Sequence, residues 1–278
     1  MCCLLSAVCE SRIVMRIRDE RLQWAEAKLI EAQRIALRYF RTRLRVERKP
    51  DRSPVTVADR RVEEFLRRAL QRAFPAEAIV GEEFGRSPGL TLARSSYWTI
   101  DPIDGTRAFS RGLPTWSILV GYVEHGRPVM GVCDFPALGV TVGVGSRAPA
   151  YEQCGRSRRR LPKVQRPPPL DDAVILHGGI KWWLKTPYRR GMERVVSRCF
   201  LERAYGDAYG HLWVLRGRAD AVLEYGVKVW DMVPIAALAR ATGRVMVDCS
   251  GRPCFTGPET LVAHPALAKQ IVRTLSST

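Results

Sequence analysis

The residues best suited to chemistry lie in segment 98–106, which reads Trp-Thr-Ile-Asp-Pro-Ile-Asp-Gly-Thr. Two carboxylates, Asp101 and Asp104, directly follow an apolar stretch typical of a strand and precede a glycine that permits a tight turn. Carboxylate oxygens without cysteine or histidine suit Mg²⁺ or Mn²⁺ better than Zn²⁺, and Mg²⁺ most often acts on phosphate. Asp-Pro and Asp-Gly are also common turn formers, so the pair alone leaves a structural role open.

Other carboxylates also lie at the ends of predicted elements. An apolar run ends in the pair Glu82-Glu83, and Asp231 follows Trp230 where a helix is expected to begin. Three acidic element ends can converge on one point. Because adjacent residues of an extended segment point to opposite faces, Glu83 is expected to face away if Glu82 faces a metal.

The motifs at residues 81–83, 101–106 and 230–231 together resemble the inositol monophosphatase family of Mg²⁺-dependent phosphomonoesterases, in both order and spacing. The resemblance extends from about residue 22 to residue 275. It implies an α/β (α+β) fold, a layered α-β-α-β-α sandwich of the inositol monophosphatase type. It also implies two or three Mg²⁺ ions and hydrolysis of a phosphate ester by metal-activated water without a covalent intermediate.

The resemblance assigns roles to the metal ligands. Glu82, Asp101 and the backbone carbonyl of Ile103 are implied to bind the first metal. Asp101 is implied to bridge to a second metal, whose site Asp104 and Asp231 complete. The alternative for each carboxylate is a capping or turn role.

The implied catalytic residues are Glu82, Thr106 and Asp59. Thr106, hydrogen-bonded to Asp59 of the segment Val-Thr-Val-Ala-Asp at 55–59, is implied to orient and deprotonate the water. Asp59 could instead only cap its helix. The amides of Gly105 and Thr106 are expected to hold a phosphate oxygen if a helix begins there, because the first N–H groups of a helix are unsatisfied.

Substrate selection is predicted from a second region. Residues 206–208 read Gly-Asp-Ala, where inositol phosphatases usually carry a small hydroxyl residue in the middle, and Glu224 matches the acidic residue that contacts the alcohol part of the substrate. Asp207, Ala208 and Glu224 are therefore the expected substrate-binding residues. Two carboxylates with Tyr209 favour a cation that carries a ring, such as histidinol phosphate. The alternative is that Asp207 caps a helix and Tyr209 packs in the core.

Segments 206–210 and 51–60 look like the histidinol-phosphatase branch of the family. The leading prediction is therefore a Mg²⁺-dependent phosphatase that converts L-histidinol phosphate to L-histidinol and phosphate. An inositol-1-monophosphatase or broad sugar-phosphate phosphatase is the first alternative, and a nucleotide 3′-phosphatase the next. An RNA- or transcription-associated binding protein that keeps the fold is the alternative from another class, which the intact acidic motifs disfavour.

Composition agrees with an enzyme of this kind. The 278 residues are 46% hydrophobic, and the eight cysteines and four histidines show no CxxC or HExxH pattern, so a zinc enzyme is disfavoured. No apolar stretch approaches the roughly 18 to 20 residues that span a bilayer. The opening residues make a poor signal peptide, so a cytoplasmic enzyme without a membrane partner is expected.

The formal charge of +17 raises the hypothesis that the protein binds nucleic acid. Most arginines are expected on solvated helix faces, and the dense run at 156–160 on a basic hairpin tip, with no RNA-binding motif beside it. We therefore expect weak, non-specific nucleic-acid binding at most. The other expected partners are a small phosphorylated substrate and a second copy of the chain in a homodimer.

We predict a loose tail over residues 1–18, in which Met15 is a possible internal start, and one phosphatase domain over 19–278. That domain divides into a metal-binding half, 19–146, and a substrate half, 147–278. Apolar periodicity predicts helices over 19–43, 58–74, 189–198, 206–216, 230–242 and 265–275, with low order over 147–170. It predicts strands over 78–80, 97–100, 116–123, 128–134, 140–144, 173–176, 219–224, 244–247 and 260–263.

Overall fold

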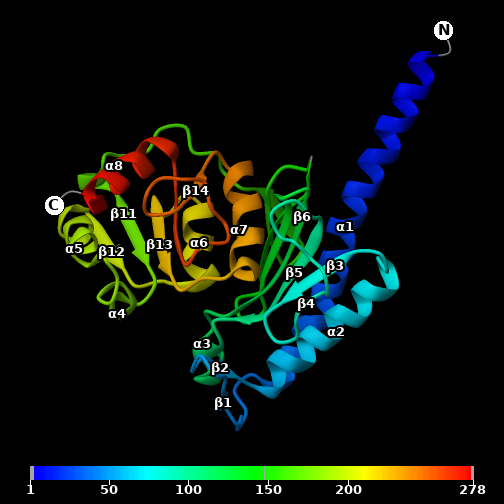
Figure 1. The fold of residues 1–278 in the computed structure, drawn as a ribbon, viewed down its shortest axis with the longest axis horizontal. Helices are drawn as coiled ribbons and strands as arrows, with labels where there is room; N and C mark the ends of the chain where they lie inside the picture. Colours follow the sequence, from blue (N-terminus) through cyan, green and yellow to red (C-terminus); the bar gives the residue numbers. More distant parts are fainter. Residues whose placement is uncertain (1–2, 147, 277–278) are drawn as a thin grey trace.

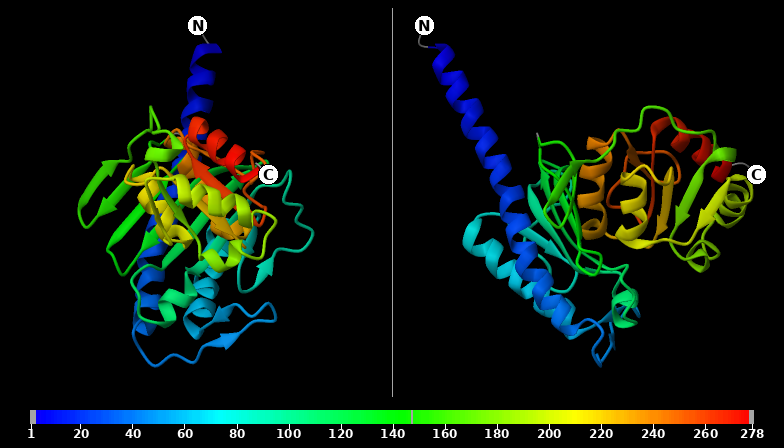
Figure 2. Two further views of the ribbon diagram at one scale, coloured as in Figure 1. Left: turned by 90° about the vertical axis from the view of Figure 1, so that its left-hand side faces the viewer. Right: turned by 180° about the vertical axis from the view of Figure 1, so that it is seen from behind.

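The computed structural model describes residues 3–146 and 148–276, and only the backbone of residues 3–19. The chain forms five stacked layers, which Figure 1 shows edge-on and Figure 2 shows from two further directions. Helices alternate with sheets, which confirms the predicted α-β-α-β-α sandwich. Within the described residues, no helix is both long and apolar enough to span a membrane.

The first two layers are a helix pair and a large sheet. Helices α1 (Cys3–Tyr39) and α2 (Val57–Ala73) pack together against an eight-stranded sheet, because their apolar positions recur every three or four residues. All neighbouring strands run antiparallel except β3 and β5. In sheet order the strands are β10 (Ser157–Arg160), β9 (Tyr151–Cys154), β8 (Val140–Val144), β7 (Arg127–Phe135), β6 (Ser117–Glu124), β5 (Tyr97–Asp104), β3 (Ala78–Gly81) and β4 (Gly85–Arg86).

The other three layers complete the sandwich. Helices α6 (Asp207–Leu215) and α7 (Val229–Ala241) lie between the two sheets, and α5 (Arg189–Arg198) and α8 (Pro265–Ser276) cover the far face (Figure 1). The second sheet has the order β12 (Leu201–Arg203), β11 (Val174–His177), β13 (Ala221–Tyr225), β15 (Glu259–Ala263) and β14 (Val245–Val247). Short elements are β1 (Glu47–Arg48), β2 (Pro54–Val55), α3 (Thr106–Ser110), η1 (Leu170–Asp172) and α4 (Ile180–Trp183).

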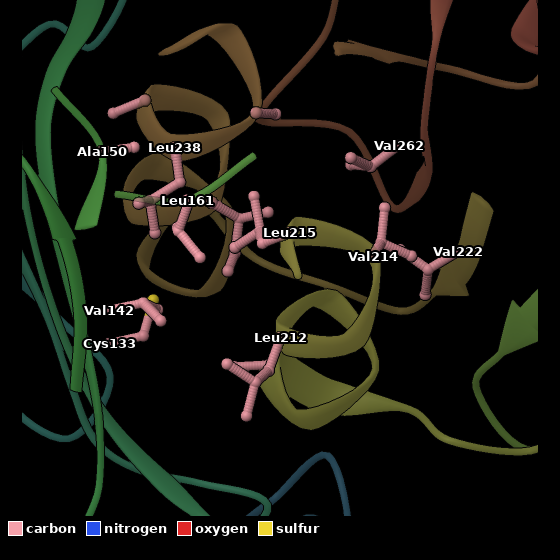
Figure 3. Packing of buried hydrophobic residues seen from close by; sticks show 14 of the residues in the cluster. Cys133, Val142, Ala150, Leu161, Leu212, Val214, Leu215, Val222, Leu238 and Val262 are labelled. Carbon is pink, nitrogen blue, oxygen red and sulfur yellow. The ribbon is translucent and has the colours of Figure 1, made fainter. Parts of the chain in front are cut away.

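One buried cluster joins both sheets through the central helices. Figure 3 shows Val142 of the first sheet, Leu212 of α6 and Val262 of the second sheet within this cluster. Helix α7 approaches the first sheet closely because β7 carries Gly131 at the contact. A Cβ at Gly131 would lie 2.4 Å from the Cα of Pro234, a distance that no side chain tolerates. The glycine therefore sets how near α7 lies to the first sheet.

All the predicted helices and strands are present, but two segments differ from expectation. Residues 3–18 belong to α1, where a loose tail was predicted. The low order predicted for 147–170 is wrong over residues 151–160, which form the β9–β10 hairpin. The arginines of this hairpin do not show the apolar pattern of a strand, and β propensity depends on cross-strand packing. The cross-strand partner of Arg159 is Glu152, which binds it at 3.1 Å.

A buried acid on β7 gives the fold a pH dependence. Asp134 is 5% exposed, and burial raises its pKa to about 7 although Thr141 donates a hydrogen bond to its Oδ1 at 2.7 Å. The folded protein thus holds this proton more tightly than the unfolded chain. The resulting stability is complete below the ordinary pKa of 3.8 and is lost as the pH rises through about 7.

We expect Asp134→Asn to remove this dependence, since the amide does not ionise. The unfolding free energy of the variant relative to wild type should increase by about 4 kcal/mol between pH 4 and pH 8, at about 1.4 kcal/mol per tenfold change in the acidity constant. Urea unfolding at the two pH values measures this difference. Equal shifts for both proteins would contradict the assignment.

Candidate active site

The two carboxylates of the central motif lie at the C-terminal end of strand β5, within the first sheet. The ladder to β6 is irregular between Asp101 and Asp104, where Pro102 lacks an N–H to donate. The amide of Ile103 instead donates to Asp101 Oδ1 at 3.0 Å. Asp101 and Asp104 are 2% and 7% exposed, so both acids at the end of this strand are largely buried.

Asp104 also joins the first sheet to helix α6. Its Oδ2 accepts hydrogen bonds from Ser117 Oγ at 2.9 Å and from the amide of Ala208 at 2.8 Å. The predicted metal ligand Asp104 and the predicted substrate residue Ala208 are therefore in direct contact. The amide of Ala208 is used by Asp104 in this arrangement.

Thr106 and Asp59 meet as the Val-Thr-Val-Ala-Asp segment suggests. Thr106 Oγ1 lies 3.1 Å from Asp59 Oδ1 and 3.0 Å from the carbonyl of Ile103. Asp59 also caps α2, because its Oδ2 accepts the amide and hydroxyl of Thr56 at 2.8 and 2.6 Å. Capping and the contact with Thr106 coexist, since each uses a different oxygen of the same carboxylate.

Asp231 reaches the site from the start of α7. Its Oδ2 accepts the amide of Lys228 at 2.7 Å, an N-terminal cap that orients the side chain. Its carboxyl group also shares a hydrogen bond with Asp101. Residues 130 positions apart in the sequence therefore face one another.

Glu82 and Glu83 lie in the turn between β3 and β4. Their Oε1 atoms accept hydrogen bonds from Lys49 Nζ at 2.7 and 2.6 Å respectively. The two side chains converge on one lysine because the alternation of a strand does not hold in this turn, and whether Glu83 faces away from a metal stays a prediction. Burial works against the charge of Lys49, but the two carboxylates raise its pKa.

A second group of acids lies on the α6 side. Glu224 of β13 is 4% exposed, accepts the amide of Asp207, and leaves Oε1 without a partner among the described residues. Asp207 is exposed and has a φ of 58°, a left-handed conformation that aspartate tolerates. A Cβ at Gly105 would lie 3.2 Å from Asp207 Oδ2, so this carboxylate lies against the turn after Asp104.

The acids repel one another. Burial, reinforced by Glu82, Asp104 and Asp231, raises the pKa of Asp101 well above its ordinary value. Burial and the charge of Glu82 raise the pKa of Asp231 to about 7. Burial, Asp207 and Asp231 likewise raise the pKa of Asp104. A cation at this position would relieve the repulsion and favour the ionised carboxylates.

The donor set fits a hard cation, since every predicted ligand is a carboxylate or carbonyl oxygen. As the side chains stand, no three histidine, cysteine, aspartate or glutamate residues of the described chain are grouped like a complete metal site. The charges of Glu82, Asp104 and Asp231 nevertheless all act on Asp101, although the four side chains are not arranged as a metal site.

Sequence reasoning missed several polar neighbours of the site. Lys49 binds Glu82, Ser117 binds Asp104, and the charge of Arg107 acts on Asp207. No spacing rule links these pairs. Tyr209 packs edge-to-face with Tyr205 at 5.5 Å and Trp213 at 5.9 Å, which supports the alternative that it is a packing residue.

Residues 18–278 match the model of the inositol monophosphatase family. The chain belongs to this family. A histidinol-phosphatase of Mycobacterium tuberculosis is 30% identical over 234 residues, which are 84% of this chain and 89% of that protein. An inositol-1-monophosphatase of the same species is 31% identical over 228 residues, 80% of this chain and 78% of that protein.

Solved structures agree with the family assignment. An IMPase of Thermotoga maritima superposes with a TM-score of 0.79 at 26% identity, covering 92% of this chain and 96% of that one. An inositol monophosphatase of Zymomonas mobilis superposes with a TM-score of 0.80 at 26% identity, covering 94% and 99%. This inositol monophosphatase family member is a phosphoric monoester hydrolase.

Proposed function

We propose that the chain is a Mg²⁺-dependent phosphatase that hydrolyses L-histidinol phosphate to L-histidinol and phosphate. The observation that carries the substrate choice is the pair of carboxylates, Asp207 and Glu224, which lie close to each other and to Asp104. Sequence identity does not decide it, because histidinol-phosphatase and inositol-phosphatase relatives are 30% and 31% identical. Two neighbouring carboxylates favour a cationic alcohol over a neutral polyol.

The metal ligands in this proposal are Glu82, Asp101, Asp104, Asp231 and the carbonyl of Ile103. Mg²⁺ in such a site would neutralise charge on the phosphoryl oxygens and make a water molecule more acidic. Lys49 Nζ lies 2.7 Å from Glu82 Oε1, so a metal bound by that oxygen would displace the lysine from it. Two or three ions is the number that family resemblance implies.

The proton path in this proposal uses Thr106 and Asp59. Burial raises the pKa of Asp59 to about 6, against the effect of its hydrogen bonds from Thr56. Asp59 is therefore mostly ionised at neutral pH and can accept a hydrogen bond from Thr106 Oγ1 at 3.1 Å. Thr106 Oγ1 would then accept a proton from the attacking water while its own hydroxyl proton passes to Asp59, which becomes neutral.

The phosphate and alcohol positions follow from the same geometry. Gly105, with a φ of 81°, ends β5 and begins α3, and the amides of Gly105 and Thr106 lie at the first turn of that helix. Such amides can hold a phosphate oxygen. Glu224 Oε1 is buried and has no partner in the part of the chain that the structure describes, so it can accept a hydrogen bond from the substrate ammonium.

Activity against a panel of phosphate esters tests this proposal most directly. We expect kcat/KM for histidinol phosphate to exceed that for inositol 1-phosphate and for a simple sugar phosphate. Faster hydrolysis of inositol 1-phosphate would favour the inositol-phosphatase alternative. A preference for a nucleotide 3′-phosphate would favour the third alternative, and no turnover of any ester would favour a binding protein.

The contacts of the arginine-rich hairpin bear on whether the chain binds nucleic acid. Arg159 is paired with Glu152 at 3.1 Å, and the guanidinium of Arg158 lies 3.4 Å from the centroid of the Tyr151 ring. These contacts within the hairpin support a structural role for both arginines.

We expect RNA affinity to be weak and to collapse between low and physiological salt, as non-specific phosphate contacts do. Neutralising Arg158, Arg159 and Arg160 should change phosphatase turnover little. Filter binding at several salt concentrations measures the RNA affinity. Tight, sequence-selective binding at physiological salt would overturn the expectation.

We further propose a homodimer in the cytoplasm. Both statements rest on the resemblance to the family. Sedimentation equilibrium and cell fractionation test them. A monomer, or a protein recovered with membranes, would contradict them.

A further inference from the structure

A pocket lies away from the carboxylate site, at the other end of α6. This helix begins at Asp207 in the site and ends at Leu215, and its next residues form one wall of the pocket. Residues 162–167 form the opposite wall and His264, just before α8, closes it. The cavity measures about 370 Å³, within the usual range for small-molecule sites, roughly 300 to 1,000 Å³.

The lining of this pocket is strongly basic. Lys163, Arg166 and Arg218 are exposed, and no acceptor for their side chains is found in the described part of the chain. Arg216 also lines it, but Glu152 binds this guanidinium at 2.8 Å. Asp220 is the acidic lining residue, and its Oδ2 accepts the amide of Val174 at 2.8 Å. Positive charge therefore exceeds negative charge around the cavity.

Arg244 does not line the cavity itself, but it adjoins two lining residues, Pro162 and Gly217, and is 4% exposed. Its Nη1 donates to the carbonyls of Thr242 at 3.2 Å and Pro162 at 3.5 Å. Its Nη2 is buried, lies 4.0 Å from the position of a Cβ on Gly217, and has no acceptor among residues 3–146 and 148–276. A buried donor without an acceptor is costly, so negative charge in the adjacent cavity would stabilise this guanidinium.

The charge of Arg244 persists at neutral pH. Burial lowers its pKa to about 10, and Asp220 opposes that change. Because Pro162 and Gly217 both line the cavity and both adjoin the guanidinium, the charge lies just behind the pocket wall. Guanidinium groups bind phosphate oxygens in pairs of parallel hydrogen bonds, so the pocket suits a phosphate group.

We propose that this pocket binds a phosphate-bearing small molecule of about nucleotide size, at a site separate from the carboxylate cluster. Lys163, Arg166 and Arg218 would hold the phosphate, and the positive charge of Arg244 behind the wall would favour it. The apolar wall residues Val164, Pro167 and Ala219 would pack against an organic part, for which the cavity leaves room beyond an inorganic phosphate. The proposal concerns a second site and does not depend on which ester is hydrolysed.

Calorimetric titration of AMP into the full chain tests the proposal. The titration contains EDTA, which prevents hydrolysis and metal-dependent binding at the carboxylates, and 0.15 M salt, at which weak diffuse contacts are screened. We expect saturable binding at one site per chain, tighter than the binding of inorganic phosphate. Absence of saturable AMP binding would overturn the proposal.

Paired variants locate the site. Arg166→Gln with Arg218→Gln should weaken AMP binding at least about tenfold, since each removes a charge-assisted hydrogen bond. Arg156→Gln with Arg160→Gln, which removes the same charge from the neighbouring hairpin, should leave it unchanged. Equal losses in both pairs would overturn the proposal in favour of a diffuse polyanion surface.

Two further variants complete the test. Arg244→Met should weaken AMP binding, and its thermal unfolding shows whether the variant is folded. Asp104→Asn, in the carboxylate site, should bind AMP as wild type does. Loss of binding in Asp104→Asn would place AMP in the phosphatase site and contradict the proposal.

Discussion

Replacing Asp104 with Asn is expected to reduce phosphatase turnover by about a hundred- to ten-thousandfold. A ligand carboxylate supports metal catalysis worth several kcal/mol, and each 1.36 kcal/mol is about tenfold in rate. The fold should survive, because an amide oxygen can still accept the hydrogen bonds from Ser117 Oγ and the amide of Ala208. Steady-state kinetics and circular dichroism measure the two effects.

Metal removal and a matched variant control this experiment. Chelation should abolish wild-type activity and Mg²⁺ should restore it, while Zn²⁺ should substitute poorly for oxygen ligands. Asp172→Asn removes an exposed carboxylate in η1, remote from the site, and should be neutral. Near-normal activity of Asp104→Asn would contradict the assignment of the metal site.

The second large effect is expected from Asp207→Asn, which should raise KM for histidinol phosphate about ten- to a hundredfold. The substrate ammonium loses a charge-assisted hydrogen bond of about 1.5 to 3 kcal/mol. A neutral polyol phosphate should be spared, since it offers no cation. Asparagine tolerates the left-handed φ of 58° at this position, so the backbone should not change.

Two companion variants sharpen this result. Glu224→Gln should have a similar effect, because its carboxylate completes the acidic pair. Glu202→Gln changes an exposed acid that binds His177 at 2.8 Å, and it should leave the KM values unchanged. If Asp207→Asn impairs both kinds of substrate equally, the histidinol assignment fails and a general phosphatase takes its place.

Much of the site was predictable because its signals are local. Asp101, Asp104 and Thr106 follow one strand within six residues, and Asp231 caps the helix that the sequence places there. Hydrophobic periodicity predicted the helices and strands, since each must bury one face. The stacking of these elements into a sandwich came from the resemblance, because periodicity does not specify how the elements pack.

Contacts between distant segments were decided by the tertiary structure. Lys49 binds Glu82 and Glu83, the amide of Ala208 binds Asp104, and Arg244 lies against Pro162. These pairs join loops and element ends that no spacing rule connects, so their positions depend on packing of the complete chain. Local sequence determined which residues can act chemically. Long-range packing determined which groups bind or neutralise them, because these partners are set by distance in space.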